Sequence, residues 1–171
     1  VLIKFELKKG LHIPNDLQTK IESEESYYKA YNKTLNYLSY SLRSEKQIKD
    51  YLVKNDFAHY SERLIQQLKD LKLIDDLVYA QSYVRTQANV NLKGPRNIER
   101  ELKEKGVPEQ DIWTALDEYS YEQQLQNAVE LSDKQWKKTS KHSTIESINK
   151  VKKYLLNKGY SFELIDEIIT N

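Results

Sequence analysis

The chain has no cysteine and no methionine, and its 171 residues include only four glycines and three prolines. Without cysteine there is no disulfide framework, no thiol nucleophile and no thiolate metal site, a composition that fits the reducing cytoplasm. Because glycine and proline punctuate tight turns, their scarcity favours helices over hairpins. We therefore expect an all-α fold.

Long apolar runs are also missing. No stretch approaches the roughly twenty apolar residues that a membrane-spanning helix needs, and the opening segment VLIKFELKKG does not have the pattern of a signal peptide. We predict a protein with no membrane contact. Since the chain starts at Val1 instead of methionine, we expect its native start to lie upstream.

Groups suited to catalysis or metal binding are few. His12, His59 and His142 stand alone, without the spacing of metal ligands. Asp75 and Asp76 are adjacent acids, but a hard cation needs about six oxygens and no further acids are spaced to supply them. No glycine-rich phosphate loop or nucleophile elbow is present. The sequence predicts a non-enzyme with no metal site and no cofactor.

Helical periodicity dominates what the sequence does contain. From Tyr27 onward, apolar residues recur at steps of three and four, which indicates amphipathic helices. Upstream, alternating apolar and charged residues from Ile3 to Leu7 predict a short strand, and Leu17 with Ile21 predicts a short helix. We divide the chain into an N-terminal region at residues 1–26 and three-helix repeats at residues 27–73, 74–120 and 121–171.

The repeats can be overlaid on their middle helices. The anchors are Ile48 with Leu52, Ile98 with Leu102, and Val151 with Leu155, and the three leucines are 50 and 53 positions apart. Four residues after each leucine comes a residue that tolerates the left-handed conformation, followed by an apolar or aromatic one. These breaks are Asp56-Phe57, Gly106-Val107 and Gly159-Tyr160. Such a period, with three helices per unit, predicts stacked helical repeats.

Capping residues predict where helices begin. Asp75 and Asp76 can accept hydrogen bonds from the first free N–H groups of a helix, and Gly94-Pro95 ends one helix and begins another. Ser44 with Gln47 and Ser143 with Glu146 match the capping box, and Ser61 and Ser161 can cap further helices. On the core faces of later helices we expect Ile112, Trp113, Leu116, Ile145, Ile148, Val151, Tyr154 and Leu155.

The net charge is only +1, but the charges are unevenly placed. Between Lys134 and Lys158 eight lysines face one acid, Glu146. The helix predicted after Gly94 has cationic residues on the side away from its buried face, namely Arg96, Arg100, Lys103 and Lys105. A basic helical face is often only solvated, but these two stretches are the best candidates for contact with a polyanion.

Tyrosine is abundant, at thirteen residues. Most of the tyrosines lie at core spacings, where a ring can seal the edge of a small helical unit while its hydroxyl stays wet. Stacking on unpaired bases is a second interpretation for Tyr27, Tyr28 or Tyr40.

Three groups of segments occur together in this chain. They are Leu38-Ser39 with Leu42-Arg43-Ser44-Glu45, then Leu71-Lys72-Leu73-Ile74-Asp75-Asp76 with Tyr79-Ala80 and Tyr83-Val84-Arg85, and Lys93-Gly94-Pro95-Arg96 with Ile98, Glu101-Leu102 and Lys105-Gly106-Val107. With them the sequence resembles the RecX family of regulators of the bacterial RecA recombinase. The resemblance covers nearly the whole chain and is weakest in the third repeat.

The resemblance implies tandem three-helix repeats in an elongated curved array. It also implies a protein that lies along the RecA filament on single-stranded DNA, limits filament extension, and so restrains recombinase and coprotease activity. We expect a cytoplasmic monomer. The expected contact residues are Arg85, Lys93, Arg96, Arg100 and Lys103, followed by Lys137, Lys138, Lys150 and Lys153. Arg43 and Asp76 are expected to hold repeats together, and the other structural positions are Asp75, Tyr79, Gly94, Pro95, Gly106 and Gly159.

Two other functions stay open. A helical-repeat protein could bind DNA independently of any recombinase, and such binding should be tight and fall steeply with salt. A peptide-gripping scaffold of the tetratricopeptide type is a third possibility, but that fold uses two helices and a shorter period.

Overall fold

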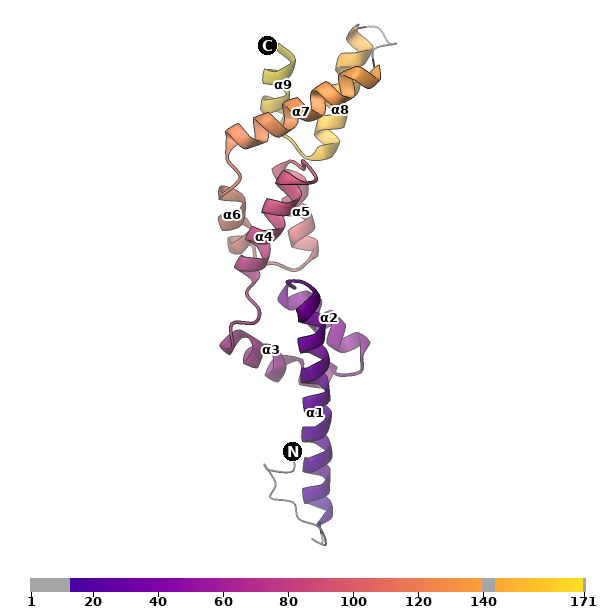
Figure 1. Cartoon of the computed structure of the whole chain (residues 1–171), viewed down its shortest axis with the longest axis vertical. Coiled ribbons are helices and arrows are strands. Elements are labelled where there is room, and N and C mark those ends of the chain that lie inside the picture. Colours follow the sequence, from indigo (N-terminus) through magenta and orange to yellow (C-terminus); the bar gives the residue numbers. More distant parts are fainter. Residues whose placement is uncertain (1–12, 140–143, 171) are drawn as a thin grey trace. The chain divides into compact units, whose positions relative to one another are not determined.

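A computed structural model of the chain describes residues 13–139 and 144–170, and every regular element within them is helical. The strand predicted at residues 3–7 and the capping residue Ser143 lie outside the described residues. Contacts divide the chain into two compact units, one ending at Ile74 and the other beginning at Asp75. The elements of both units are labelled in Figure 1.

The first unit contains the helices α1 (Asn15–Tyr40), α2 (Glu45–Lys54) and α3 (Ser61–Asp70), with a 3₁₀ turn, η1 (Ala58–Tyr60), before α3. The prediction of a short helix followed by a separate one from Tyr27 was wrong, because α1 is continuous. Its middle has no glycine or proline to stop propagation. The buried core of the unit comprises Tyr27, Ala30, Ile48, Leu52, Phe57, Leu64, Ile65, Leu68 and Ile74.

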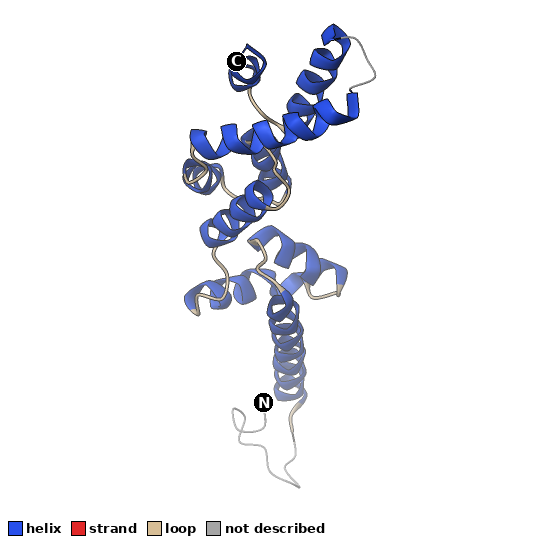
Figure 2. Cartoon of the chain, turned by 45° about the horizontal axis from the view of Figure 1, so that its top comes forward, coloured by secondary structure: helices blue, strands red, loops and turns tan. Residues whose placement is uncertain are grey.

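The second unit contains two groups of three helices. The first group is α4 (Asp76–Asn89), α5 (Pro95–Glu104) and α6 (Glu109–Asp117), and the second is α7 (Tyr121–Thr139), α8 (Thr144–Lys158) and α9 (Phe162–Thr170). Each group has its own cluster of buried apolar residues, centred on Ile98 and Leu102 in one and on Val151 and Leu155 in the other. Only short loops separate α4 from α5, α5 from α6, and α8 from α9 (Figure 2).

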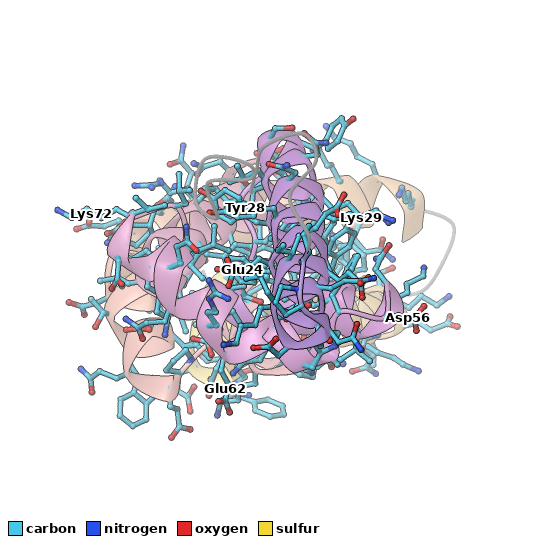
Figure 3. The ribbon with its side chains drawn as sticks, turned by 90° about the horizontal axis from the view of Figure 1, so that it is seen from below. Glu24, Tyr28, Lys29, Asp56, Glu62 and Lys72 are labelled. Carbon is cyan, nitrogen blue, oxygen red and sulfur yellow. The ribbon has the colours of Figure 1, made fainter. Side chains whose placement is uncertain are left out.

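The predicted left-handed breaks are confirmed in all three repeats. Asp56, Gly106 and Gly159 have φ of 65°, 74° and 95°. After each one, the next residue donates its N–H to the carbonyl of the leucine anchor five residues earlier, as in Phe57 N to Leu52 O at 2.9 Å. This is the Schellman arrangement, which satisfies carbonyls at a helix end and buries the following side chain. Lys72 takes the same conformation after α3, with φ of 54°, and projects from the surface (Figure 3).

Most predicted caps are confirmed. Ser44 and Gln47 form both hydrogen bonds of the capping box, and the Asp75 carboxylate accepts from the N–H groups of Leu77 and Val78. Ser161 Oγ accepts from Leu164 N at 3.2 Å. The cap predicted at Ser61 was wrong, because the chain enters α3 directly from the 3₁₀ turn.

Two predicted core positions were also wrong. Trp113 is 56% exposed and Ile145 is 74% exposed. On α6 the core face is taken by Ile112 and Ala115, so the residue next to Ile112 is rotated by about 100° toward solvent. On α8 the buried register is Ser147, Val151 and Leu155, which Ile145 does not share.

Candidate partner-binding surface

The start of α5 and the end of α8 meet through their backbones. Gly94 N donates to Lys158 O at 2.8 Å, and Arg96 N donates to Gly159 O at 3.2 Å. A Cβ atom on Gly94 would lie 2.4 Å from the carbonyl carbon and oxygen of Gly159, so no side chain fits there. The N–H groups at the start of α5 are thus satisfied by carbonyl groups at the end of α8, which also lack partners within their own helix. The positive end of the α5 dipole meets the negative end of the α8 dipole, and the two attract.

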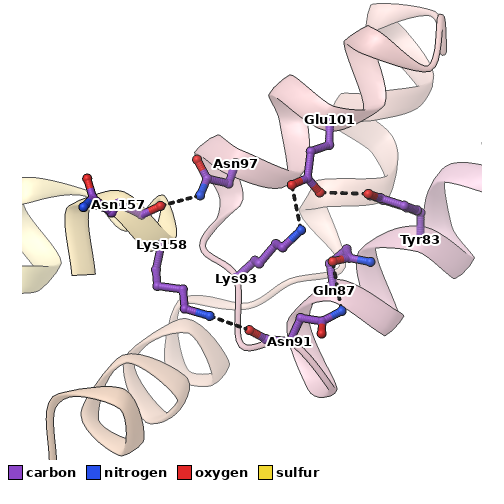
Figure 4. A network of polar contacts seen from close by, with 8 residues as sticks. All are labelled: Tyr83, Gln87, Asn91, Lys93, Asn97, Glu101, Asn157 and Lys158. Atoms are coloured by element: carbon purple, nitrogen blue, oxygen red, sulfur yellow. Dashed lines mark hydrogen bonds and ion pairs between the residues drawn. The ribbon is translucent and has the colours of Figure 1, made fainter. Parts of the chain in front are cut away.

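Side chains reinforce this junction (Figure 4). Asn97 Nδ2 donates to Asn157 O at 2.7 Å, and Lys158 Nζ donates to Asn91 O at 3.2 Å. The start of a helix is often an anion site, but here two of its N–H groups are already used. An anion at α5 must therefore be held by side chains.

A buried polar cluster lies beneath the junction. Tyr160 donates its hydroxyl to Leu92 O at 3.0 Å and lies 3.4 Å from the hydroxyl of Tyr119. Asn127 Nδ2 donates to Ala88 O and to the Tyr119 hydroxyl, both at 2.9 Å. Burial, followed by the hydrogen bond with Tyr119, raises the pKa of Tyr160. The cluster links the second repeat to the third, and no local sequence signal marks it.

Arg96 and Arg100 remain exposed on the outer face of α5, one helical turn apart. Among the described residues, neither arginine has a carboxylate oxygen within 4.0 Å. Lys103 lies on the same face but is engaged, since its Nζ is 2.8 Å from Glu99 and 3.0 Å from Glu109. These hydrogen bonds raise the pKa of Lys103. The arginine pair is therefore an exposed part of the predicted cationic face that is outside the ion pairs of the described residues, and it acts on Glu163 and Glu101 only at longer range.

Lys93 holds the loop before α5 in place (Figure 4). Its Nζ lies 2.6 Å from Glu101 Oε1, and Tyr83 donates its hydroxyl to the other carboxylate oxygen at 2.8 Å. Burial alone would raise the pKa of Glu101, but the hydrogen bonds from Lys93 and Tyr83 outweigh it, and the pKa is lowered. The Lys93 side chain is only 27% exposed, so its charge is neutralised within the repeat.

The other predicted contact residues are more scattered. Arg85 on α4 is 3.6 Å from Glu118, and its side chain is 61% exposed. Lys137 and Lys138 are exposed in the last turn of α7, Lys150 on α8 lies 3.6 Å from Glu146, and Lys153 is exposed one turn further along α8. The structure therefore brings Arg96, Arg100 and Lys103 together on α5. It leaves Lys93 in the loop before α5 and the other predicted cations on α4, α7 and α8.

The predicted structural positions have identifiable contacts. Tyr79 is buried and stacks near Tyr83 with ring centroids 6.1 Å apart. Pro95 is the first residue of α5, where its missing N–H is not needed. The Arg43 guanidinium lies 4.4 Å from the centre of the Tyr37 ring, within its own repeat.

Neither a metal-ligand cluster nor a membrane-spanning helix is found in the part of the chain that the structure describes. No group of three or more histidine and acidic side chains there is arranged to hold a metal ion. In the same part of the chain, no helix combines the length and the apolar character required to cross a bilayer.

Comparison with known proteins gives matches in all three repeats. Models of the first, second and third three-helix domains of RecX match residues 30–67, 75–116 and 122–169. Regulatory protein RecX of Oceanobacillus iheyensis is 37% identical over 171 residues, covering 99% of this chain and 62% of the relative. Its counterpart in Bacillus cereus is 42% identical over 167 residues, covering 96% of this chain and 62% of the relative. The chain thus spans about three fifths of the length of these relatives.

Two solved structures of RecX proteins are also similar to this chain. A crystal structure of regulatory protein RecX aligns with a TM-score of 0.89 at 34% identity, over 99% of this chain and 84% of that one. The crystal structure of RecX from Lactobacillus salivarius aligns with a TM-score of 0.80 at 40% identity, over 86% of this chain and 96% of that one.

Proposed function

Because this chain belongs to the RecX family of regulatory proteins, we propose that it binds the RecA recombinase filament on single-stranded DNA and limits its extension. Shorter filaments would lower recombinase and coprotease activity. The observation that supports this proposal is membership of the RecX family, a family of RecA regulators. The family models match all three repeats of the chain. The chain would act as a monomer in the bacterial cytoplasm, by binding and without catalysis.

The exposed arginines of α5 support a contact with DNA. A guanidinium can form two parallel hydrogen bonds with a phosphate, and Arg96 and Arg100 have no competing carboxylate within 4.0 Å among the described residues. We assign the primary phosphate contact to this pair, with Lys103 at its edge. Arg85 and the lysines Lys137, Lys138, Lys150 and Lys153 form a weaker, distributed contribution, and Lys93 is assigned to the repeat interior.

Titration into a recombinase reaction tests the proposal. ATP hydrolysis by the recombinase on single-stranded DNA, and filament length by electron microscopy, should both fall as the chain is added at fixed salt. Inhibition at amounts well below one chain per recombinase subunit would indicate blocked extension instead of competition for DNA. If neither quantity changes, the proposal is wrong.

The same experiment separates this function from independent DNA binding. An independent DNA-binding protein should bind bare single-stranded DNA tightly and inhibit only when it covers the strand, because it competes for the same phosphates. A filament regulator can bind bare DNA weakly and still inhibit. Affinity for bare DNA, measured at the salt concentration of the ATPase assay, distinguishes the two.

A further inference from the structure

Three side chains of the first unit form a continuous stack. The Arg43 guanidinium lies 4.4 Å from the centre of the Tyr37 ring, and this ring is stacked on Tyr51 with centroids 4.2 Å apart and planes 3° from parallel. Tyr37 lies near the end of α1 and Tyr51 in the middle of α2. The stack therefore ties α1, the following loop and α2 into one platform.

A groove of about 550 Å³ opens beside this platform. It is lined by both tyrosines and by polar side chains from one face of α2, namely Gln47, Asp50, Lys54 and Asn55. All of these residues belong to the first unit, whereas the arginine pair on α5 belongs to the second. A volume of several hundred Å³ is within the range of small-ligand sites.

The polar groups of the groove have hydrogen-bonding capacity to spare. Asn55 Nδ2 donates to Tyr51 O at 2.9 Å, which leaves the Asn55 amide oxygen as an acceptor. Gln47 Oε1 accepts from Ser44 N at 3.1 Å, which leaves its amide N–H groups as donors. Within the described residues, neither Asp50 nor Lys54 is in an ion pair. The groove thus offers donors, acceptors, one cation and one carboxylate beside two aromatic rings.

The second repeat fills the corresponding positions differently. With the offset of 50 residues between the two repeats, Arg43 corresponds to Lys93 and Tyr51 to Glu101. Lys93 is neutralised by Glu101 at 2.6 Å. By contrast, Arg43 faces a tyrosine and has no carboxylate within 4.0 Å among the described residues, and its buried Nε has no hydrogen-bond partner there. The first repeat has kept a cation whose charge its own residues do not neutralise.

We propose that this groove binds an unpaired nucleobase of single-stranded nucleic acid, with the base stacked on the face of the Tyr51 ring that Tyr37 does not cover. Arg43 strengthens the platform through its cation–π contact, Lys54 is placed to meet the adjoining phosphate, and Gln47, Asp50 and Asn55 face the edge of the base. Proteins that bind single strands without sequence preference commonly combine aromatic rings, on which bases stack, with cations that contact the backbone phosphates. Arginine often adds a cation–π contact. The inference extends the proposed function, from which it takes single-stranded DNA as the partner.

The test uses the full chain and two labelled oligonucleotides of equal length, one of mixed sequence and one with abasic sugars and the same phosphates. Tyr51→Leu should weaken binding of the mixed oligonucleotide by between about 5- and 150-fold, the usual effect of losing one stacked base, and leave binding of the abasic one unchanged. Tyr51→Phe keeps the ring and should bind both as the parent chain does. Phe162→Ala, which removes a ring that is 58% exposed on α9, is the matched control and should change neither.

A measurement on the unmodified chain guards against a misfolded variant. An oligonucleotide containing 2-aminopurine should lose fluorescence on binding, because stacking on an aromatic ring quenches that base. No quenching, or an equal loss of affinity for both oligonucleotides with Tyr51→Leu, overturns the inference. Base-dependent binding by a chain that does not affect the recombinase would overturn the proposed function and leave the groove assignment standing. Recombinase inhibition without base-dependent binding would overturn the groove assignment and leave the proposed function standing.

Discussion

A residue with positive φ follows the middle helix of every repeat, and the three residues are Asp56, Gly106 and Gly159. An L-residue with a side chain pays for this conformation in steric strain, least for asparagine and aspartate and most for β-branched residues. This explains why the first repeat can use an aspartate where the other two have glycine.

Gly106→Val should therefore lower the free energy of unfolding by at least about 1 kcal/mol, because φ at this position is 74°. Gly106→Asn is the matched control and should cost less, since asparagine tolerates the left-handed region. Urea denaturation followed by circular dichroism measures both. Equal stability of the valine variant and the parent would show that the strain is relieved by a local change of backbone.

The Glu101 carboxylate links pH to the stability of the second repeat. Its pKa is lowered from an ordinary value of 4.5, so the folded state favours the charged form. The contribution is complete above pH 4.5 and is lost as pH falls through the lower, folded-state pKa. Glu101→Gln should cost about 1–2 kcal/mol at neutral pH and flatten the acid limb of the stability profile. Glu25→Gln, on the exposed surface of α1, should leave the profile as steep as in the parent chain.

Among the helices, the meeting of α5 with α8 is the contact that most depends on one residue. Gly94→Ala would place a Cβ atom 2.4 Å from the backbone of Gly159, and backbone at both ends leaves no flexible group to move aside. The variant should lose on the order of 2 kcal/mol of stability, with faster amide hydrogen exchange in both helices. Pro95→Ala changes the neighbouring residue without this clash and should have a smaller effect confined to α5. Faster exchange in α5 alone with Gly94→Ala would contradict the assigned coupling.

Sequence patterns predicted the parts of the fold that depend on a few adjacent residues. Ser44 with Gln47, Asp75 before α4, and the left-handed breaks are decided by steric and hydrogen-bonding preferences within one helical turn. Contacts between distant residues were not predictable. Asn97 and Asn157 are 60 residues apart, and nothing in either local sequence selects the other. Spacing also placed Trp113 on the wrong face, because a helix only nine residues long fits more than one apolar register.

At the candidate site, sequence identified the cations and not their partners. Arg96, Arg100 and Lys103 recur at helical spacing, so their common face on α5 could be predicted. Which of them are already paired depends on Glu99, Glu109 and other carboxylates brought near by folding. The aromatic platform in the first repeat was missed for the same reason, since Tyr37 and Tyr51 are on different helices.

For the whole molecule, the three repeats share a backbone pattern but differ in the side chains at equivalent positions. Ala30 and Ala80, 50 residues apart, are both fully buried, and so are the anchors Ile48 and Ile98. Arg43 and Lys93 are also equivalent, yet one stacks on a ring and the other forms an ion pair. The repeats therefore keep the same core but use the position of Arg43 and Lys93 differently. The second repeat neutralises its cation internally, whereas the first leaves its cation available to support a ligand site.

Two kinds of DNA contact in separate units should respond differently to salt. Each lost phosphate contact reduces the slope of log K against log salt by about 0.7 for single strands, so Arg96→Gln with Arg100→Gln should reduce it by about 1.4. The same double variant should weaken inhibition of the recombinase without changing helix content. Arg96→Lys with Arg100→Lys keeps both charges and should retain most of the slope. Tyr51→Leu removes stacking and not charge, so it should lower affinity at every salt concentration with no change in slope. An unchanged slope in the glutamine variant would show that the α5 arginines are only solvated, because a contact with phosphate must release counterions.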